Sequence, residues 1–320
     1  MIGSSLLTRR SALVAGLAVS LVGCAKNQPT APAHVWQGEA LGAPGSIKLY
    51  GLDKSTADQW FAKAGQTIDR LSRIFSLYQN HSEISRLNRE TELQNASPEF
   101  LELLDQSMRI SELTEGAFDI SVQAYWTTVT NWQGQNISLA EKTRKMAKAR
   151  QLVNYRNIQV SGSNIRFLQK GMAITLNGIA QGYIAEQVAH LLAQSGATSG
   201  LVDLGEFQAF GQREFTIDIQ SPHNVLHTAG QIKLQNAGLA TSASGGGALG
   251  ENFSHIFAPS GYPVVPEFAS VSVVHASASW ADALATAFTL MPEREVFDSL
   301  EKAGVQGAML VRNDGQILEI

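Results

Sequence analysis

The chain has 320 residues, a formal net charge of −4 at pH 7 and a hydrophobic fraction of 44%, a composition that is ordinary for a globular enzyme. Its basic residues are scattered along the whole sequence, which argues against a nucleic-acid partner, because such proteins concentrate Lys and Arg on one face. With one cysteine, no disulfide can form within the chain, and stability must come from the core.

An export signal is predicted at residues 1–23. Arg9 and Arg10 precede an apolar run, Ser11 to Gly23, that is too short to span a bilayer as a stable helix. The run ends at Cys24 and resembles the cleavage box of bacterial lipoproteins, whose cysteine becomes the lipidated first residue. The arginine pair leaves open whether export follows the twin-arginine route. We therefore expect a periplasmic protein anchored to a membrane by a lipid on Cys24.

Residues 24–35 are predicted to form a tether, because they are polar, contain prolines and lack periodicity. The remainder, 36–320, is predicted to be the folded body. Its length fits either one elaborated domain or two fused lobes.

Four helices are predicted from apolar residues at three- and four-residue spacing, from capping residues and from glycines that stop helices. They are expected at residues 56–78, from Ser97 to Gly116, from Ser138 to about Val153 and from Ala180 to Ser195. The buried stripe of the first is expected to hold Trp60, Ala64, Ile68, Leu71 and Phe75. That of the second is expected to hold Leu101, Leu104 and Met108.

Short runs rich in β-forming residues predict strands in the second half of the chain. They are Gly200–Leu204, Phe215–Ile219, Gln231–Leu234, Ala269–Val274 and Ala308–Val311. Because helices come first and mixed strands later, the predicted fold class is α+β, with mixed sheets and flanking helices.

Two patterns that suggest a binding site fail on their context. The glycines at 245–250 have G-x-G-x-x-G spacing, but residues 252–257 after them read as a strand, whereas a dinucleotide fold needs a helix there. His223 and His227 have the spacing of a helical metal pair, yet proline and asparagine make that segment a loop. Surface histidines are therefore favoured over a zinc site.

The run from Ala281 to Thr286 suggests a cation site. On a helix, Asp282 and Thr286 project from one face and offer two oxygen ligands to a hard cation, and the alanines between them leave room for a phosphate. Taken alone, the run also fits an ordinary buried helix rich in alanine. The glycines at 178 and 182 would let the backbone approach a dinucleotide closely, or permit tight helix packing.

Seven segments strengthen the first interpretation, because together they follow the order of one known family. They are Ile74–Asn88, Gly116–Val122, Leu176–Tyr183, Leu201–Glu206, Ala240–Ser242, His255–Phe257 and Ala281–Thr286. In this order the chain resembles the ApbE family of FAD:protein FMN transferases. The forms Leu-Asn-Gly-Ile-Ala-Gln-Gly and Val-Asp-Leu-Gly-Glu are similar to the branch called NosX, which is associated with nitrous oxide reduction.

The resemblance implies that a threonine or serine hydroxyl of a target protein attacks the FMN-side phosphorus of FAD, and that AMP leaves. It also implies a Mg²⁺ ion held by the side chains of Asp282 and Thr286 and by the backbone carbonyls of Gly178 and Ala285. Asp282 is thereby also expected to be catalytic. The implied acceptor is an electron-transfer flavoprotein of a membrane redox complex, either one that supports nitrous oxide reductase or a sodium-pumping or other complex.

Other positions match family residues that contact FAD: Tyr78, Ala117, Phe118, Asp119, Thr175 and Gln181. His255 matches a family histidine and is expected to take or orient the proton of the incoming hydroxyl. The chain departs from the family directly after it. It reads Ala-Pro-Ser-Gly at 258–261 where the family carries Asp-Pro-x-Thr-Gly, and Thr175 and Gln181 also differ from many members.

These departures leave three alternatives to the transferase. The protein could hold FAD as an accessory without transferring it, or hydrolyse FAD to FMN and AMP as a pyrophosphatase. A lipoprotein that binds a small solute is an alternative of another class, and its binding would survive both EDTA and the loss of Asp282.

Overall fold

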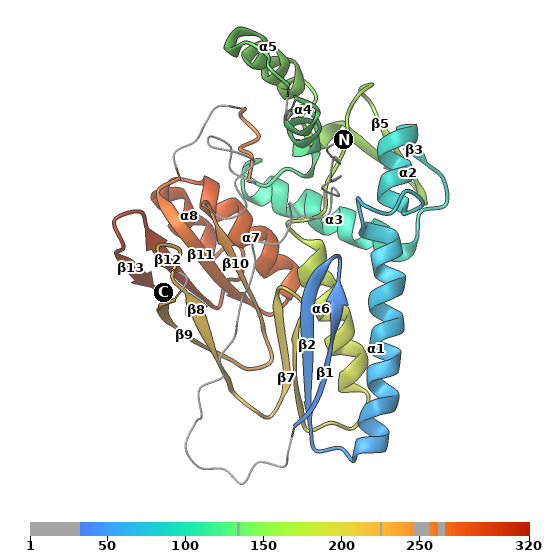
Figure 1. Ribbon diagram of the computed structural model, residues 1–320, viewed down its shortest axis with the longest axis vertical. Helices are drawn as coiled ribbons and strands as arrows, with labels where there is room; N and C mark the ends of the chain where they lie inside the picture. The colour runs from blue at the N-terminus through green and yellow to red at the C-terminus, as the bar shows by residue number, and fades with distance from the viewer. Residues whose placement is uncertain (1–32, 133–134, 225, 246–255, 262–265) are drawn as a thin grey trace, which may run out of the picture.

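The computed structural model describes residues 33–132, 135–224, 226–245, 256–261 and 266–320 (Figure 1). Cys24 and His255 lie outside the described residues, as does most of the tether. The folded body begins with strand β1 at His34, two residues before the predicted boundary. Among the described helices, none is both long and apolar enough to cross a membrane.

An eight-stranded sheet forms the centre of the molecule, and every pair of neighbouring strands in it is antiparallel. Its order is β1 (His34–Ala40), β2 (Ala43–Tyr50), β6 (Ser199–Asp203), β7 (Phe207–Gly211), β10 (Gly238–Ala243), β11 (Phe268–His275), β12 (Gly307–Arg312) and β13 (Ile317–Glu319). The order brings β2, from the start of the chain, beside β6. The early and late parts of the sequence therefore share one sheet.

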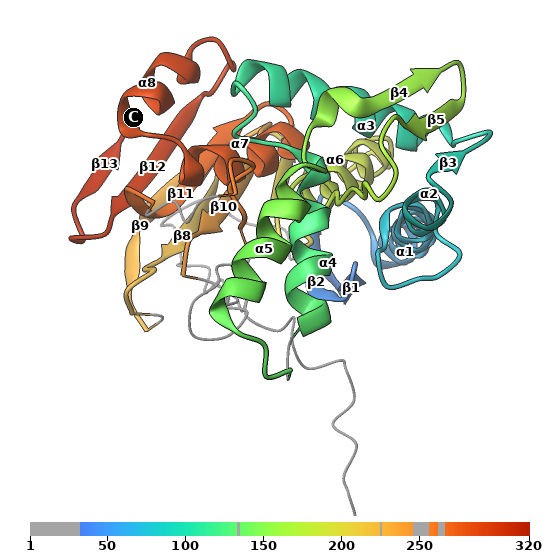
Figure 2. The ribbon, with the colours of Figure 1, turned by 90° about the horizontal axis from the view of Figure 1, so that it is seen from above.

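Eight α-helices are described. They are α1 (Lys54–Phe75), α2 (Glu83–Glu90), α3 (Pro98–Leu113), α4 (Gln123–Trp132), α5 (Leu139–Arg150), α6 (Ala180–Ala193), α7 (Ala278–Leu290) and α8 (Glu293–Leu300). Helices α1, α6 and α7 pack on the sheet, whereas α4 and α5 stand together away from it (Figures 1 and 2).

The four predicted helices, now α1, α3, α5 and α6, are confirmed to within a few residues, because their local signals act as expected. Ser97 and Ser138 accept hydrogen bonds at the starts of α3 and α5, from the backbone N–H groups of Phe100 at 3.3 Å and Glu141 at 3.2 Å. Gly116, after α3, takes the left-handed conformation that favours glycine, with φ of 85°.

The buried faces of two helices differ slightly from prediction. Trp60 is half-buried and carries the Lys63 ammonium over its ring, whereas Phe61 is buried in its place. On α3, Leu101 and Met108 are half-buried and Leu103 lies in the core. A helix face packed on two neighbours is wider than a single stripe, which moves the buried positions by one residue.

The smaller elements complete the fold. All five predicted strands are confirmed, as β6, β8 (Phe215–Gln220), β9 (Thr228–Leu234), β11 and β12. The β8–β9 hairpin packs on the sheet through a second apolar cluster. Short strands β3 (Glu92–Leu93), β4 (Ile158–Ser161) and β5 (Asn164–Phe167) form a separate sheet.

The strand predicted at 252–257 is wrong at its described end. Its first four residues lie outside the described residues, and Ile256 and Phe257 are not in a strand. Phe257 instead packs its ring against Tyr125 and Trp126 of α4, with centroid separations of 5.8 and 5.7 Å. A short run that contains Phe and Ile can therefore belong to a loop that packs on a helix as well as to a strand.

Candidate active site

The start of α6 is pressed against α7, and a glycine makes this contact possible. A Cβ atom added to Gly182 would lie 2.2 Å from the carbonyl oxygen of Ala278, so no larger residue fits without a shift of the backbone. The backbone N–H of Gly182 donates to Asp282 Oδ2 at 3.2 Å. The glycine-bearing segment Leu176–Tyr183 and the aspartate-bearing segment Ala281–Thr286, which are far apart in the sequence, thus meet directly.

Asp282 is buried, and Glu206 interacts electrostatically with both Asp282 and Asp203. Burial raises the pKa of Asp282 to about 7, although its hydrogen bond from Gly182 acts in the opposite direction. Burial, followed by the charge of Asp282, raises the pKa of Glu206 well above its usual range. Burial also raises the pKa of Asp203 to about 6. Ionising these carboxyl groups together is therefore unfavourable unless a cation is bound nearby.

The turn between β6 and β7 carries two of these acids and is fixed by Gln181 of α6. The Gln181 Nε2 donates to the carbonyl oxygen of Leu204 at 3.4 Å. A Cβ atom on Gly205 would lie 2.6 Å from that Nε2, and Gly205 has φ of 99°. Glu206 accepts from the backbone N–H of Thr241 at 3.3 Å, which joins the turn to β10.

Sequence reasoning did not assign a role to Asp203 or Glu206. Both lie in the Leu201–Glu206 segment that carries the family resemblance, so the signal was present. What could not be seen was the electrostatic interaction of Glu206 with Asp282 and Asp203, which depends on how distant segments pack together.

Thr286 lies one helical turn after Asp282, in a second cluster of small and polar groups. Its Oγ1 is 3.2 Å from Ser242 Oγ on β10. A Cβ atom on Gly178 would lie 3.1 Å from the same Oγ1 and 3.5 Å from the ring of Phe118. The structure therefore brings together the predicted residues Gly178, Phe118 and Thr286, and it adds Ser242.

The other residues that were predicted to contact FAD lie in different surroundings. The Asp119 carboxylate is buried and accepts from Ser121, through its backbone N–H at 2.8 Å and its hydroxyl at 2.6 Å, and from the Tyr155 N–H at 3.0 Å. Burial raises the pKa of Asp119 against these bonds. These contacts give the side chain a structural role within the protein.

Thr175 joins the segment before α6 to the short helix Ile120–Val122, since its N–H donates to the Ile120 carbonyl at 2.8 Å. Ala117 is half-buried beside Phe118. Tyr78, in contrast, is 64% exposed after the end of α1. It has the exposed ring that stacking on a flavin or an adenine would require.

The oxygen atoms around Asp282 fit a hard divalent cation in part. No described residue donates a hydrogen bond to Asp282 Oδ1, and Thr286 offers a hydroxyl one turn away. The Ala285 carbonyl, another predicted ligand, is fully buried and already accepts from the Thr289 hydroxyl at 2.8 Å. Within the described ranges, no three His, Cys, Asp or Glu side chains form a metal cluster.

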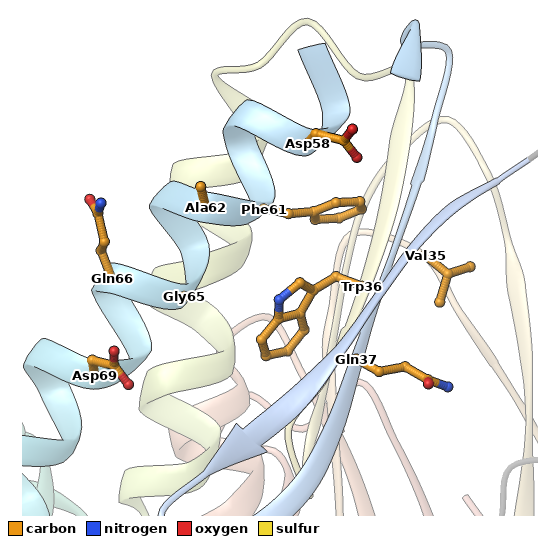
Figure 3. A pocket seen from close by; sticks show the side chains of 9 residues that line it. All are labelled: Val35, Trp36, Gln37, Asp58, Phe61, Ala62, Gly65, Gln66 and Asp69. Atoms are coloured by element: carbon orange, nitrogen blue, oxygen red, sulfur yellow. The ribbon is translucent and has the colours of Figure 1, made fainter. Parts of the chain in front are cut away.

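A cavity of about 600 Å³ lies elsewhere, between β1 and α1 (Figure 3). Trp36 and Phe61 face each other across it, and Asp58 and Asp69 lie at its α1 side. None of the predicted site residues lines this cavity, so it is separate from the candidate active site.

Comparison with known proteins finds a matching family and relatives over most of the chain. The profile described as the ApbE family matches residues 41–310. The protein named FAD:protein FMN transferase of Haemophilus influenzae is 25% identical, over 94% of this chain and 92% of the relative. The protein of that name from Klebsiella pneumoniae is also 25% identical, over 95% and 92%.

Solved structures show the same fold. The flavin transferase ApbE of Vibrio cholerae superposes with a TM-score of 0.74 and 21% identity, covering 90% of this chain and 97% of that one. The ApbE protein of Thermotoga maritima gives a TM-score of 0.77 and 22% identity, with 90% and 96% covered. The predicted fold class is therefore confirmed.

Proposed function

The chain belongs to the ApbE family, and we propose from this premise that it transfers FMN from FAD to a protein, as its relatives are named to do. The observation that carries the proposal is the contact between α6 and α7, where the Gly182 N–H reaches Asp282. This contact brings the Asp282 carboxylate to the start of α6, and the Thr286 hydroxyl follows one turn later on α7. Such a combination suits a pyrophosphate together with a cation.

We propose that the pyrophosphate of FAD binds at the start of α6. No N-cap side chain bonds to this helix, while the Ala180 N–H donates to the Leu176 carbonyl at 2.7 Å and the Gly182 N–H to Asp282, so an anion here would be stabilised by the positive end of the helix dipole. Gly178 and Gly182 let the backbone approach closely, and Gln181 fixes the neighbouring turn through Leu204. The Phe118 ring beside Gly178 would limit access of water to the phosphates.

In this proposal Mg²⁺ is held by Asp282, Thr286 and the Gly178 carbonyl. When bound, it would stabilise negative charge on the phosphoryl oxygens and on departing AMP. Asp282 would be ionised in that state, because a cation offsets both its burial and the charge of Glu206. Ala285 contributes less to the proposal, since its carbonyl already accepts the Thr289 hydroxyl.

The acceptor group in the proposal is a threonine or serine hydroxyl, whose oxygen attacks the FMN-side phosphorus while AMP leaves. His255 is the proposed proton acceptor. The segment after it departs from the family pattern but is well supported: the Gly261 N–H donates to the Ala258 carbonyl at 2.9 Å, and the Tyr125 hydroxyl donates to the Pro259 carbonyl at 3.2 Å. A tight turn braced by α4 replaces the longer family loop.

The proposed location is the periplasmic side of a membrane, with a lipid on Cys24 and the predicted tether, residues 24–35, whose last two residues lie in β1. The proposed acceptor is a flavoprotein of a membrane redox complex, such as one that supports nitrous oxide reductase. Changing Cys24 to Ser should release the protein from the membrane fraction. Unchanged membrane association would contradict the lipid anchor.

The function is tested by intact-mass spectrometry of candidate acceptor domains after incubation with residues 33–320, FAD and Mg²⁺. We expect a covalent FMN mass gain, lost on adding EDTA and in Asp282→Ala. Asp298→Ala, which changes an exposed carboxylate on α8, is the matched control and should retain the gain.

Other outcomes separate the alternatives. Consumption of FAD to FMN and AMP without a mass gain on any acceptor identifies a pyrophosphatase. FAD bound but unchanged identifies an accessory protein. Failure to bind FAD, with another small solute bound in the presence of EDTA, identifies a solute-binding lipoprotein.

A further inference from the structure

Helix α5 carries an unusually basic surface for an acidic chain. Five of the 24 Lys and Arg residues lie between Lys142 and Arg150, with Glu141 as the one carboxylate of the helix. Arg144, Lys145 and Lys148 are all exposed. Basic residues are therefore concentrated in this helix, whereas they are scattered over the rest of the sequence.

Arg144 and Lys148 share the outer face of α5. At 100° per residue, they fall on the side of the helix opposite Ala149 and Met146, and Lys145 lies at the edge of this side. Ala149 is buried, and with Met146 it belongs to a small apolar cluster that joins α5 to Tyr125 of α4. We call the surface formed by Arg144, Lys145 and Lys148 the basic face. The pair α4 and α5 projects from the body beyond α3 and α7 in Figure 1, with α5 outermost.

The basic face is connected to the candidate active site through α4. The short helix Ile120–Val122 leads from Phe118 directly into α4, and its Ile120 carbonyl accepts from Thr175. On the other side, Tyr125 and Trp126 of α4 hold Phe257, which follows the proposed proton acceptor by two residues. A protein that docks on α5 would therefore contact a helix that packs, through α4, on segments of the proposed site.

We propose that the basic face docks an acidic surface of the acceptor protein, and this rests on the proposed function. Charge complementarity favours this partner. A surface with three clustered cations, on a chain whose net charge is −4, attracts an acidic partner and orients it by this helix. The nearest salt bridge is weak, because Lys145 Nζ lies 3.7 Å from Glu141 Oε1 with both side chains largely open to solvent.

A lipid surface fits the basic face less well. Helices that lie in a membrane interface combine cations with large apolar side chains on the opposite face. On α5 that opposite face is packed on α4, and the outer positions near the cations are Thr143 and Ala147. Leu139, which is 80% exposed, is the one exposed large apolar side chain of α5, because Met146 is half-buried.

The test reverses the basic face in the triple variant Arg144→Glu, Lys145→Glu and Lys148→Glu. Its probe is the acceptor domain that gains FMN mass in the experiment above. At about 20 mM salt we expect KM for this domain to rise about tenfold, with kcat at saturating acceptor unchanged. At about 300 mM salt the difference should shrink, because screening removes the attraction.

A matched control reverses three exposed cations of α1, in Lys54→Glu, Lys63→Glu and Arg73→Glu, and should leave KM unchanged. The variant Arg144→Ala, Lys145→Ala and Lys148→Ala keeps helix-forming residues and should give a smaller rise than charge reversal. FAD affinity, measured without acceptor, should be equal in all variants and shows that the fold is intact.

An unchanged KM in both basic-face variants, or an equal rise in the α1 control, overturns the proposal. So does a loss of binding to phosphatidylglycerol vesicles with KM unchanged, which would assign the face to lipid. If the wild-type protein transfers FMN to no acceptor, the proposed function itself fails. If transfer occurs with unchanged KM, the docking proposal alone fails.

Discussion

The α6–α7 junction and the α4–α5 pair are built on opposite principles. At the junction, Gly182 lets two backbones touch, and Glu186 of α6 ties down the start of α7. The Glu186 carboxylate accepts from the Ser277 hydroxyl at 2.6 Å and from the Ser279 hydroxyl at 3.1 Å and N–H at 3.3 Å. In the α4–α5 pair, a cluster with only Ala124, Tyr125 and Ala149 fully buried holds two helices together.

This difference in packing fits two different tasks, the reaction at the junction and the recognition of the acceptor at the helix pair. Groups that act on a pyrophosphate must be held to a fraction of an ångström, and close packing with satisfied hydrogen bonds achieves this. A charged docking surface tolerates movement, because electrostatic attraction changes slowly with distance. Changes at the junction should therefore affect the reaction, whereas changes on the exposed surface of α5 should affect only the recognition of the acceptor.

The largest effect is expected for Asp282→Asn, which keeps the shape of the side chain but removes its charge. If Asp282 acts as proposed, kcat should fall about a hundredfold or more, because one charged group facing the phosphates is lost. The fold should remain, since an amide oxygen can still accept from Gly182. Steady-state kinetics with Asp298→Asn alongside checks this, and near-normal kcat would remove Asp282 from the mechanism.

Gly182→Ala should break the junction by overpacking. Its Cβ would lie 2.2 Å from the Ala278 carbonyl oxygen, so we expect a loss of about 1–3 kcal/mol of stability together with reduced activity. Gly65→Ala on α1 is the control, because that Cβ meets no atom within 4 Å. It should stabilise the helix by about 0.5–1 kcal/mol. Urea unfolding of both variants distinguishes close packing from a general effect of alanine.

The pH dependence of stability should show the carboxyl group at the junction. The folded-state pKa of Asp282 is raised to about 7, above the ordinary aspartate value, so the folded state binds this proton more tightly than the unfolded state does. Without divalent cations, stability should therefore fall as pH rises from about 4 to about 7. Melting temperatures of wild type and Asp282→Asn should converge below this window and separate above it. Parallel curves would contradict the assignment.

The smallest effect is expected in the helix pair. Ser138→Ala removes the hydroxyl that accepts from the Glu141 N–H at the start of α5 and should cost about 1 kcal/mol, confined to this helix. Amide hydrogen exchange should speed up in α5 and stay unchanged in α6 and α7, with FAD binding unaffected. Faster exchange at the junction would show that the two regions are coupled.

Local signals predicted much of the fold. Ser97, Ser138 and Gly116 fixed helix ends because caps and left-handed turns involve a few adjacent residues. Helices α2, α4 and α8 were missed since they are short, and a short helix gives too few periods for a clear apolar pattern. The segment at 252–257 was predicted to be a strand for a similar reason, because six residues are too few for a clear pattern.

By itself, the sequence predicted four helices, five strands, the family resemblance and the kinds of group available to the proposed site, because these depend on neighbouring residues. It did not predict strands β1, β2, β7 and β10 of the central sheet. Only the tertiary structure decided that Asp282 and Asp203 both act on Glu206, that Ser242 contacts Thr286, and that α5 and Phe257 share one apolar cluster with α4. Burial and electrostatic interaction depend on distances between remote parts of the chain, and the packing of the whole chain sets those distances.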